Sequence, residues 1–343
     1  MHGPDITRRR FLGLAAAGAA GVVLAGCGDD GDDGDGSSSP STAGGAETKD
    51  FGGRTITTAV YSRNHASSPL YWRQFAPPGL NVEVKVVTSA GDVARGLASG
   101  DLDFGLQGYF TTLIDAVGGN IGAKVIGMCS RQGAGIIART DSGVRTIPDL
   151  RGKRVGVPPP GVQTLLLTAA LDKAGMRLDR DVTAVPLGFA EHGPALERGD
   201  IDAYVGTEPN CTQSVVSGRG VRVAGIYDTP AGDVNTFMWA APKNLNDPDL
   251  LRAAAKMQRD AAELLTPRGV NDPTEWRKLL VEQFEYPEEV YRTALENVGA
   301  EWRFDDRRRS QFEGAADLMV AQGIIPSKPR IGDLLLLDYQ PAS

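Results

Sequence analysis

The chain has 343 residues and a net charge of −7. The charge is unevenly spread, because residues 1–27 carry +2, residues 28–50 carry −6 and residues 51–343 carry −3. The long C-terminal part is therefore only mildly acidic, and nothing in this balance favours a nucleic-acid-binding protein. That part is also long for a single core, so it suits two lobes of ordinary size.

Three features at the N-terminus indicate an exported lipoprotein. Residues 7–12 read Thr-Arg-Arg-Arg-Phe-Leu, which fits the twin-arginine export pattern, and an uncharged Ala- and Gly-rich run follows to residue 25. The run is shorter than the roughly 20 apolar residues that a membrane span needs. Residues 24–27 then read Leu-Ala-Gly-Cys, which resembles a lipobox. We expect export by the twin-arginine route and a lipid anchor on Cys27 at the outer face of the cell membrane. The alternative is an ordinary signal peptide with an incidental cysteine.

Residues 28–50 are predicted to form a disordered acidic linker. They contain six Asp and no large apolar side chain, so they cannot bury enough surface to offset the entropy of folding. Such a segment would serve as a solvated tether between the anchor and the folded part.

Strand and helix patterns alternate along the next two hundred residues or so. Strands are predicted at residues 55–61, 82–87, 103–106, 124–128, 135–139, 154–157, 182–186, 203–205, 221–226 and 236–240. Helices are predicted between them at residues 90–98, 111–117, 164–174, 190–197 and 212–217. The alternation predicts α/β lobes with mainly parallel sheets. Only helices are predicted after that, at residues 248–265, 274–284, 287–298 and 310–322.

A short motif occurs twice. Gly-Asp-Leu-Asp at residues 100–103 and Gly-Asp-Ile-Asp at residues 199–202 each follow a helix and precede a strand. Glycine at a helix C-terminus readily adopts the left-handed conformation that ends the helix. We interpret the pair as one supersecondary unit used once in each of two lobes.

These motifs, with residues 149–157 (Asp-Leu-Arg-Gly-Lys-Arg-Val-Gly-Val) and Glu208-Pro209, resemble one family. It is the group of ABC-transporter solute-binding proteins for nitrate, sulfonate, taurine and thiamine precursors, the NMT1/THI5-like class. The resemblance implies an α/β fold of the type II periplasmic-binding-protein kind, in which two lobes are joined by two crossover strands and a helical tail follows. Lobe 1 would comprise residues 51–140 and 236–343, and lobe 2 residues 141–235.

The resemblance also implies a function without catalysis and without a cofactor. The protein would capture a small organic molecule or anion between its lobes and deliver it to the permease and ATPase subunits of an importer. It would act as a monomer held at the membrane by its lipid anchor.

The expected ligand site follows from where the loops lie. In open α/β sheets, ligands bind beyond the carboxyl ends of the strands, where helix N-termini favour anionic or polar groups. Four loops reach this position. The predicted ligand-binding residues on them are Tyr61, Asn64, His65, Ser67, Ser68, Gln107, Gly108, Tyr109, Gly161, Gln163, Thr164, Phe189 and Glu208.

The ligand class stays open at this point. Arg63 and His65 favour an anion such as a sulfonate, whereas Glu208 and the aromatic residues favour a flat, NH-bearing heterocycle. Glu208 has an alternative role, which is to brace its own loop. Trp72 is expected to be a core anchor, and Cys129 and Cys211 are expected to be free buried thiols rather than a disulfide.

Two other functions compete with import. One is an enzyme of thiamine-precursor metabolism, which we disfavour because the chain carries neither a Cys-rich metal motif nor a Gly-x-Ser-x-Gly nucleophile elbow. The other is a sensory lipoprotein that binds solute but serves no permease.

Overall fold

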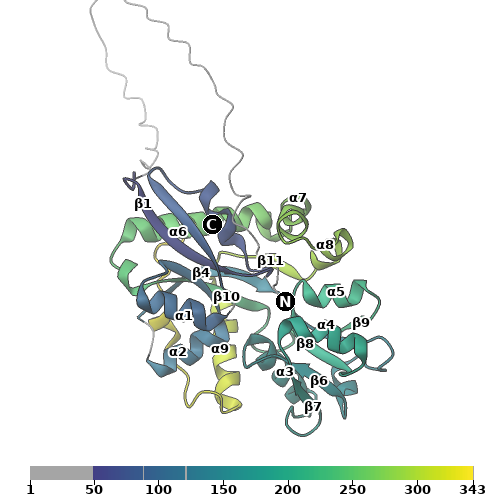
Figure 1. The fold of residues 1–343 in the computed structure, drawn as a ribbon. Helices are drawn as coiled ribbons and strands as arrows, with labels where there is room; N and C mark the ends of the chain where they lie inside the picture. The colour runs from purple at the N-terminus through teal and green to yellow at the C-terminus, as the bar shows by residue number, and fades with distance from the viewer. Residues whose placement is uncertain (1–48, 88, 120–121, 343) are drawn as a thin grey trace, which may run out of the picture. The chain divides into compact units, whose positions relative to one another are not determined.

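The structure is a computed structural model that describes residues 49–87, 89–119 and 122–342 (Figure 1). The predicted export signal, the lipid anchor at Cys27 and nearly all of the acidic linker lie outside the described residues. Within the described residues, no helix has both the length and the apolar character that crossing a membrane requires.

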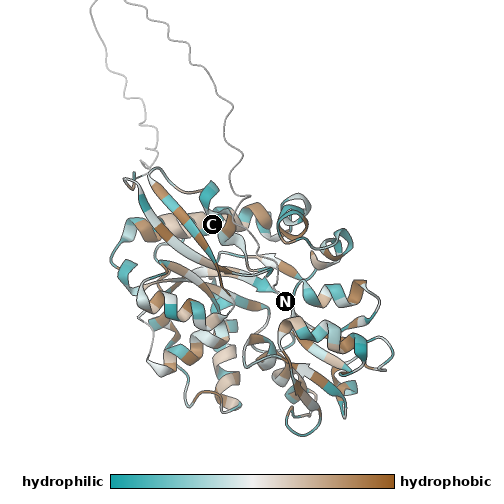
Figure 2. Cartoon of the chain, viewed as in Figure 1, coloured by the Kyte–Doolittle hydropathy of each residue, from teal (hydrophilic) through white to brown (hydrophobic). Residues whose placement is uncertain are grey.

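One group of strands builds the first half of the fold. β1 (Arg54–Tyr61) pairs in parallel with β2 (Leu80–Val87), and both strands carry apolar and polar residues, as Figure 2 shows. A four-stranded sheet has the order β11-β4-β10-β3. Its strands are β3 (Phe104–Gly108), β4 (Lys124–Gln132), β10 (Val234–Ala240) and β11 (Val298–Ala300). The two sheets lie side by side because β1 contacts β3.

The second half contains a five-stranded sheet with the order β7-β6-β8-β5-β9. Its strands are β5 (Ala134–Arg139), β6 (Arg154–Val157), β7 (Thr183–Pro186), β8 (Ala203–Thr207) and β9 (Gly220–Val223). The chain passes from the first half to the second between β4 and β5, and returns between β9 and β10.

The prediction of mainly parallel sheets is wrong. β6 pairs in parallel with β7 and β8, but β5 is antiparallel to β8 and β9, and β10 is antiparallel to β3 and β4. The reason is that β5 and β10 are the strands that follow the two crossovers, so each enters its sheet against the direction of its neighbours. The α/β class is confirmed.

Helices cover the sheets and then form the C-terminal part (Figure 1). They are α1 (Ala90–Ser99), α2 (Tyr109–Gly118), α3 (Val162–Lys173), α4 (Phe189–Arg198), α5 (Asn210–Val216), α6 (Pro248–Leu265), α7 (Pro273–Arg277), α8 (Glu288–Ala294) and α9 (Asp306–Ala321), with short 3₁₀ turns and a π-helical turn, Lys278–Gln283, between them. α6 has the predicted bounds, and its N-cap Asp247 accepts a hydrogen bond from the Leu250 N–H at 3.0 Å. β11 was missed: its first residue, Val298, was predicted as the end of a helix at residues 287–298, and its other two residues were given no element.

The repeated motif has the same geometry in both places. Gly100 and Gly199 end α1 and α4 in the left-handed conformation, at φ of 82° and 76°. The second aspartate of each copy accepts a hydrogen bond from the backbone N–H of a neighbouring strand: Asp103 from Thr57 at 2.8 Å, and Asp202 from Arg154 at 2.9 Å. The prediction of one unit used twice is confirmed.

A continuous apolar cluster joins the two halves. Tyr109, Phe110 and Leu113 of α2 belong to the same buried cluster as Val162 and Leu165 of α3. A second cluster packs α6 and the turn Ser68–Gln74 against the other face of the four-stranded sheet, which we call the first sheet. Trp72 is fully buried in this cluster. Cys129 and Cys211 are free and buried, as expected.

Candidate ligand-binding site

The carboxyl ends of β1 and β3 bring two of the predicted residues close to the start of α1. Gln107, the penultimate residue of β3, is fully buried, and its Nε2 donates to the carbonyl of Ala90 at 3.4 Å. Its Oε1 has no hydrogen-bond partner among the described residues. The Tyr61 hydroxyl donates to the carbonyl of Leu106 at 3.2 Å, and burial raises the pKa of this phenol far above its usual value. The two side chains therefore lie on adjacent strands at the same edge.

His65 is one of the buried polar residues among those predicted. Only 2% of it is exposed, and burial lowers its pKa to about 4, against the raising effect of a hydrogen bond with the backbone of Glu208. The imidazole is therefore neutral at pH 7. Its Nε2 lies 3.5 Å from Asn235 Nδ2, while its Nδ1 has no described partner. A buried, neutral imidazole of this kind can donate one hydrogen bond and accept another.

The N-termini of α2 and α3 approach each other. The N-cap of α2 is Gly108 and that of α3 is Gly161, so neither helix start has a side-chain cap. A Cβ atom on Gly108 would lie 2.9 Å from Val162 Cγ2, which shows how closely the two ends pack. Uncapped first turns keep N–H groups available for a polar ligand. Tyr109, the first residue of α2, is fully buried, and its hydroxyl has no described partner.

Other predicted residues of the first loop have protein partners. Asn64 Oδ1 accepts from the Ala66 N–H at 2.8 Å, and Ser67 Oγ donates to the Asn64 carbonyl at 2.5 Å. Ser68 Oγ donates to Gln258 Oε1 at 3.1 Å, and the same oxygen accepts from the indole of Trp72. These groups therefore shape the loop and attach it to α6, whereas the buried Nδ1 of His65 has no hydrogen-bond partner among the described residues.

In the second half, the predicted residues are held by local contacts. Thr164 Oγ1 donates to the carbonyl of Pro158 at 3.2 Å, and Gln163 beside it is half-buried. The ring of Phe189 lies edge-on to His192, with the ring centroids 6.0 Å apart. In the part of the chain that the structure describes, no hydrogen bond or ring contact joins Phe189 to His65 or Gln107.

The carboxylate of Glu208 is fully buried and has partners on both oxygens. Oε1 pairs with the Arg222 guanidinium, and Oε2 accepts from the Thr212 N–H at 3.1 Å. This is the bracing role that the sequence left as an alternative, because the carboxylate ties the start of α5 to β9.

Replacing Glu208 with alanine should therefore destabilise the protein by about 3 kcal/mol, since it leaves a partly buried guanidinium without its partner. Urea unfolding measures the change. Glu282→Ala is the matched control, because Glu282 pairs with Arg277 while 59% of its side chain is exposed, and such surface pairs contribute below about 1 kcal/mol. Equal losses in the two variants would contradict the bracing role.

Two residues that lie beside His65 in the candidate site, Gly133 and Asn235, were not among the predicted residues. Gly133 has φ of 81°, and a Cβ atom there would fall 2.0 Å from the His65 imidazole. Its carbonyl accepts from Glu208 N at 2.9 Å and from Thr207 Oγ1 at 3.1 Å. Asn235 donates to the carbonyl of Gln132 and faces His65. Both lie at the crossovers, which no strand-end rule identifies.

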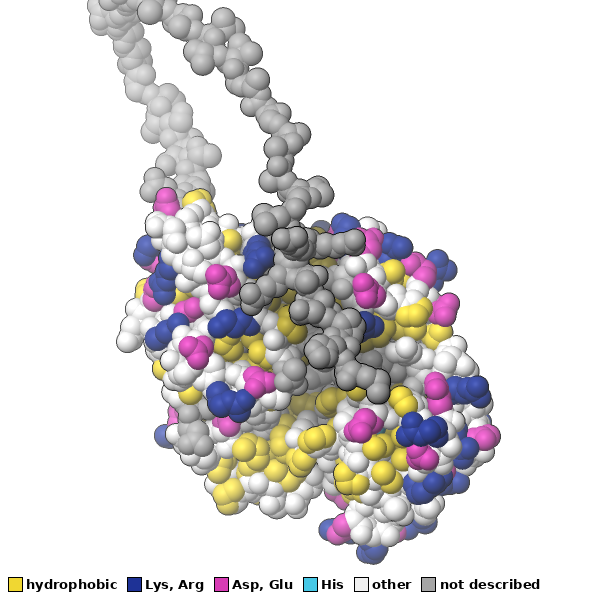
Figure 3. Space-filling view, in the orientation of Figure 1, with side chains coloured by type: hydrophobic (Ala, Val, Ile, Leu, Met, Phe, Trp, Pro, Cys, Tyr) yellow, Lys and Arg dark blue, Asp and Glu magenta, His cyan; other side chains and the backbone are white. Residues whose placement is uncertain are grey.

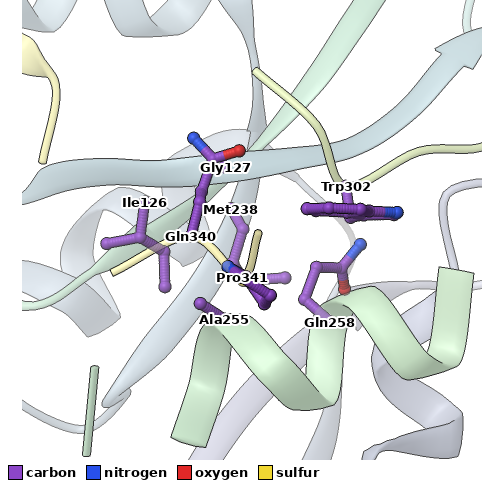
Figure 4. A pocket seen from close by; sticks show the side chains of 8 residues that line it. All are labelled: Ile126, Gly127, Met238, Ala255, Gln258, Trp302, Gln340 and Pro341. Atoms are coloured by element: carbon purple, nitrogen blue, oxygen red, sulfur yellow. The ribbon is translucent and has the colours of Figure 1, made fainter. Parts of the chain in front are cut away.

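No group of three or more His, Cys, Asp or Glu side chains arranged to hold a metal ion occurs among the described residues. A small cavity of about 10 Å³ lies away from the site, between β4, β10 and α6 and under the C-terminal residues. Figure 4 shows its lining, which includes Met238, Gln258, Trp302 and Pro341. This volume suits about one water molecule, so the cavity is too small for a solute.

Comparison with known proteins gives a family and a fold. The sequence model described as NMT1/THI5 like matches residues 74–265. A binding protein of Brucella abortus (strain 2308) is 31% identical over 154 residues, 45% of this chain and 44% of that protein. The 4-amino-5-hydroxymethyl-2-methylpyrimidine phosphate synthase of Schizosaccharomyces pombe is 28% identical over 137 residues, 40% of this chain and 38% of that enzyme. The match thus spans less than half the length of these curated relatives.

Among solved structures, the periplasmic aliphatic sulphonate binding protein SsuA from Escherichia coli is similar in fold. The TM-score is 0.68 at 17% identity, and the match covers 84% of this chain and 94% of that one.

Proposed function

This chain belongs to the NMT1/THI5-like family, and we propose that it is the extracytoplasmic solute-binding protein of an ABC importer. It would hold a small molecule at the facing ends of β1, β3, α2 and α3 and deliver it to a membrane permease with its ATPase. We also propose the two-lobe division at residues 51–140 with 236–343 and at residues 141–235, with the ligand between the lobes.

One observation carries the proposal. His65 Nδ1, Gln107 Oε1 and the Tyr109 hydroxyl are all buried and all lack a hydrogen-bond partner among the described residues. An unsatisfied buried polar group costs about 1–3 kcal/mol, and such groups are rare in folded proteins. A polar ligand that bonds to them would recover this free energy.

The chemistry of these groups favours a small organic molecule over inorganic nitrate. A neutral imidazole and an amide oxygen offer acceptors as well as a donor, so they suit a ligand with its own N–H or O–H groups. The N-termini of α2 and α3 suit an acceptor group at another point of the same ligand. Nitrate presents only acceptors, so it would leave Gln107 Oε1 unsatisfied.

The export and anchoring proposals rest on residues 7–27 alone. Twin-arginine export followed by diacylation of Cys27 would place the domain at the outer face of the membrane, within reach of its permease. Figure 3 shows Lys and Arg interspersed with Asp and Glu over the visible face of the described part. Labelling of the expressed protein with a radioactive fatty acid, lost in Cys27→Ser, would support the anchor. Equal label in the variant would contradict it.

An enzyme of pyrimidine metabolism is a second candidate, because one relative is a pyrimidine phosphate synthase. The two functions differ in whether the ligand is chemically converted. A binding protein returns its ligand unchanged, whereas an enzyme consumes it. Chromatography of each ligand after prolonged incubation with the purified protein therefore separates them.

A thermal-shift screen tests the binding proposal. Sulfonates, nitrate, pyrimidines, flavins and amines are added to the purified protein, and a ligand selective for the folded state raises the melting temperature by an amount set by RT ln(1 + [L]/Kd). We expect one organic class to do so. If none of these classes raises the melting temperature, or nitrate alone does, the proposal is wrong for this ligand range.

Tyr109→Phe gives the sharper test, because it should change stability and affinity in opposite directions. Removing a buried hydroxyl that has no partner should stabilise the free protein by about 1 kcal/mol. The same change should weaken binding of the screened ligand about tenfold, because the ligand would lose a hydrogen bond. Urea unfolding and calorimetric titration measure the two effects.

The matched control is Tyr291→Phe, whose hydroxyl donates to the carbonyl of Pro273 at 2.6 Å. This variant should lose stability and keep its affinity. If Tyr109→Phe binds the ligand as wild type does, the Tyr109 hydroxyl does not contact it.

A further inference from the structure

Tyr286 occupies an unusual position between the two halves of the fold. It lies in the segment between the π-helical turn and α8, it is 3% exposed, and its ring belongs to the apolar cluster behind the first sheet. Its hydroxyl lies 3.0 Å from Asn210 Oδ1 and 3.3 Å from the carbonyl of Arg63. Both partners are acceptors, so the phenol is the donor.

The two partners belong to different parts of the site. Arg63 is in the loop that carries His65, two residues before it, and it adopts φ of 51°, in the left-handed region that non-glycine residues seldom occupy. Its guanidinium lies over the Tyr286 ring, 4.4 Å from the centroid, an arrangement that is itself attractive. Asn210 is the first residue of α5, directly after Glu208-Pro209.

α5 belongs to the second half, because it packs on β5, β8 and β9. It also contacts α8, which lies next to it in Figure 1, and Val216 of α5 packs against the apolar cluster behind the first sheet. One phenol thus connects the His65 loop, the C-terminal helices and the helix braced by Glu208. We name this arrangement of Arg63, Asn210 and Tyr286 the clasp.

We propose that Tyr286 is a positioning residue that holds the His65 loop against α5 and so sets how far the two halves close over the site. The inference deepens the proposed function by assigning the control of that site. Tyr286 itself need not touch the ligand. It acts through the position of Arg63, which lies in the same half, and through its hydrogen bond to Asn210 of α5, which a separation of the halves would break.

Hydrogen exchange of the purified, ligand-free protein tests the clasp independently of whether a ligand is known. Tyr286→Phe keeps the ring and the guanidinium stacking but removes the donor. We expect amide exchange to accelerate roughly fivefold, as for the loss of about 1 kcal/mol, and to do so together in residues 62–68 and 210–217. Asn210→Ala should produce the same paired acceleration, and adding it to Tyr286→Phe should produce little more.

The control is again Tyr291→Phe, which loses a hydrogen bond within the C-terminal helices alone. It should accelerate exchange in residues 273–294 and leave residues 210–217 unchanged. If Tyr286→Phe behaves like this control, Tyr286 has only a local structural role and the proposal is overturned. Unchanged exchange in all segments would also overturn it. Neither result bears on whether the site binds a ligand, so failure of the clasp is distinguishable from failure of the binding function.

Discussion

Replacing Gly133 with alanine should destabilise the protein by about 2–4 kcal/mol and weaken ligand binding at the same time. Two costs add. An alanine at φ of 81° is strained by about 1 kcal/mol, and its Cβ would fall 2.0 Å from the His65 imidazole, an overlap that typically costs 1–3 kcal/mol. The buried ring must move, and it carries one of the unpartnered atoms of the site with it. Urea unfolding and calorimetric titration measure the two effects.

Gly143→Ala separates the two costs. Gly143 has φ of 77°, and a Cβ atom there would meet nothing within 4 Å, so this variant should lose only the roughly 1 kcal/mol of backbone strain. Combining Gly133→Ala with His65→Ala should restore part of the stability, because the ring that is displaced is then absent. If Gly133→Ala costs no more than Gly143→Ala, the close approach of His65 to the crossover is wrong.

Stability should fall between pH 6.5 and pH 5, a range in which ordinary carboxylates contribute little. Burial lowers the pKa of His65 to about 4, against 6.5 in the unfolded chain. The unfolded state therefore takes up a proton below pH 6.5 while the folded state does not. The resulting stability is fully present above pH 6.5 and is lost as the pH falls toward 4. For His65 alone this amounts to about 2 kcal/mol by pH 5.

His192 should add to this loss in the same direction. It is 1% exposed, stacks on Tyr204 with the ring centroids 4.8 Å apart, and burial lowers its pKa to about 4 as well. Urea midpoints at half-unit steps of pH test the expectation. The variants His65→Gln and His192→Phe should each make the urea midpoint depend less on pH, whatever they do to its value at pH 7.5. A curve that stays level from pH 7.5 to pH 5 in the wild type would show that both imidazoles are solvated.

Local chemistry made much of the fold predictable. The helix at residues 248–265 could be predicted because an aspartate, a proline and a helical apolar pattern agree there. The repeated turn could be predicted because each copy carries a glycine, a buried apolar residue and an aspartate in fixed order. Strand direction could not be predicted. It depends on where the chain crosses between the halves, and no residue pattern in β5 or β10 marks that.

The site was predictable only in part for a related reason. His65 and Tyr109 follow strands and Gln107 lies at the end of one, so a rule about strand ends finds them. Ser68 follows a strand too, but its partner Gln258 lies 190 residues away on α6, and no local signal reveals that bond.

Glu208 could be given two roles from the sequence, and only the position of Arg222 on β9 shows which partner its carboxylate has. Gly133 lies beside His65 in the candidate site because two distant loops meet there, which is a property of the tertiary fold alone.

The second aspartate of each copy of the repeated turn, Asp103 and Asp202, has a consequence for the order in which the chain folds. The bond from Thr57 to Asp103 spans 46 residues, and the bond from Arg154 to Asp202 spans 48. In each half, a short stretch of chain can therefore form a hydrogen bond between two of its strands: β1 and the start of β3 in one half, and β6 and the start of β8 in the other. β10, by contrast, pairs with strands more than a hundred residues earlier. Because short loops close at a lower entropic cost than long ones, we expect both halves to gain local order first and the crossovers to join them last.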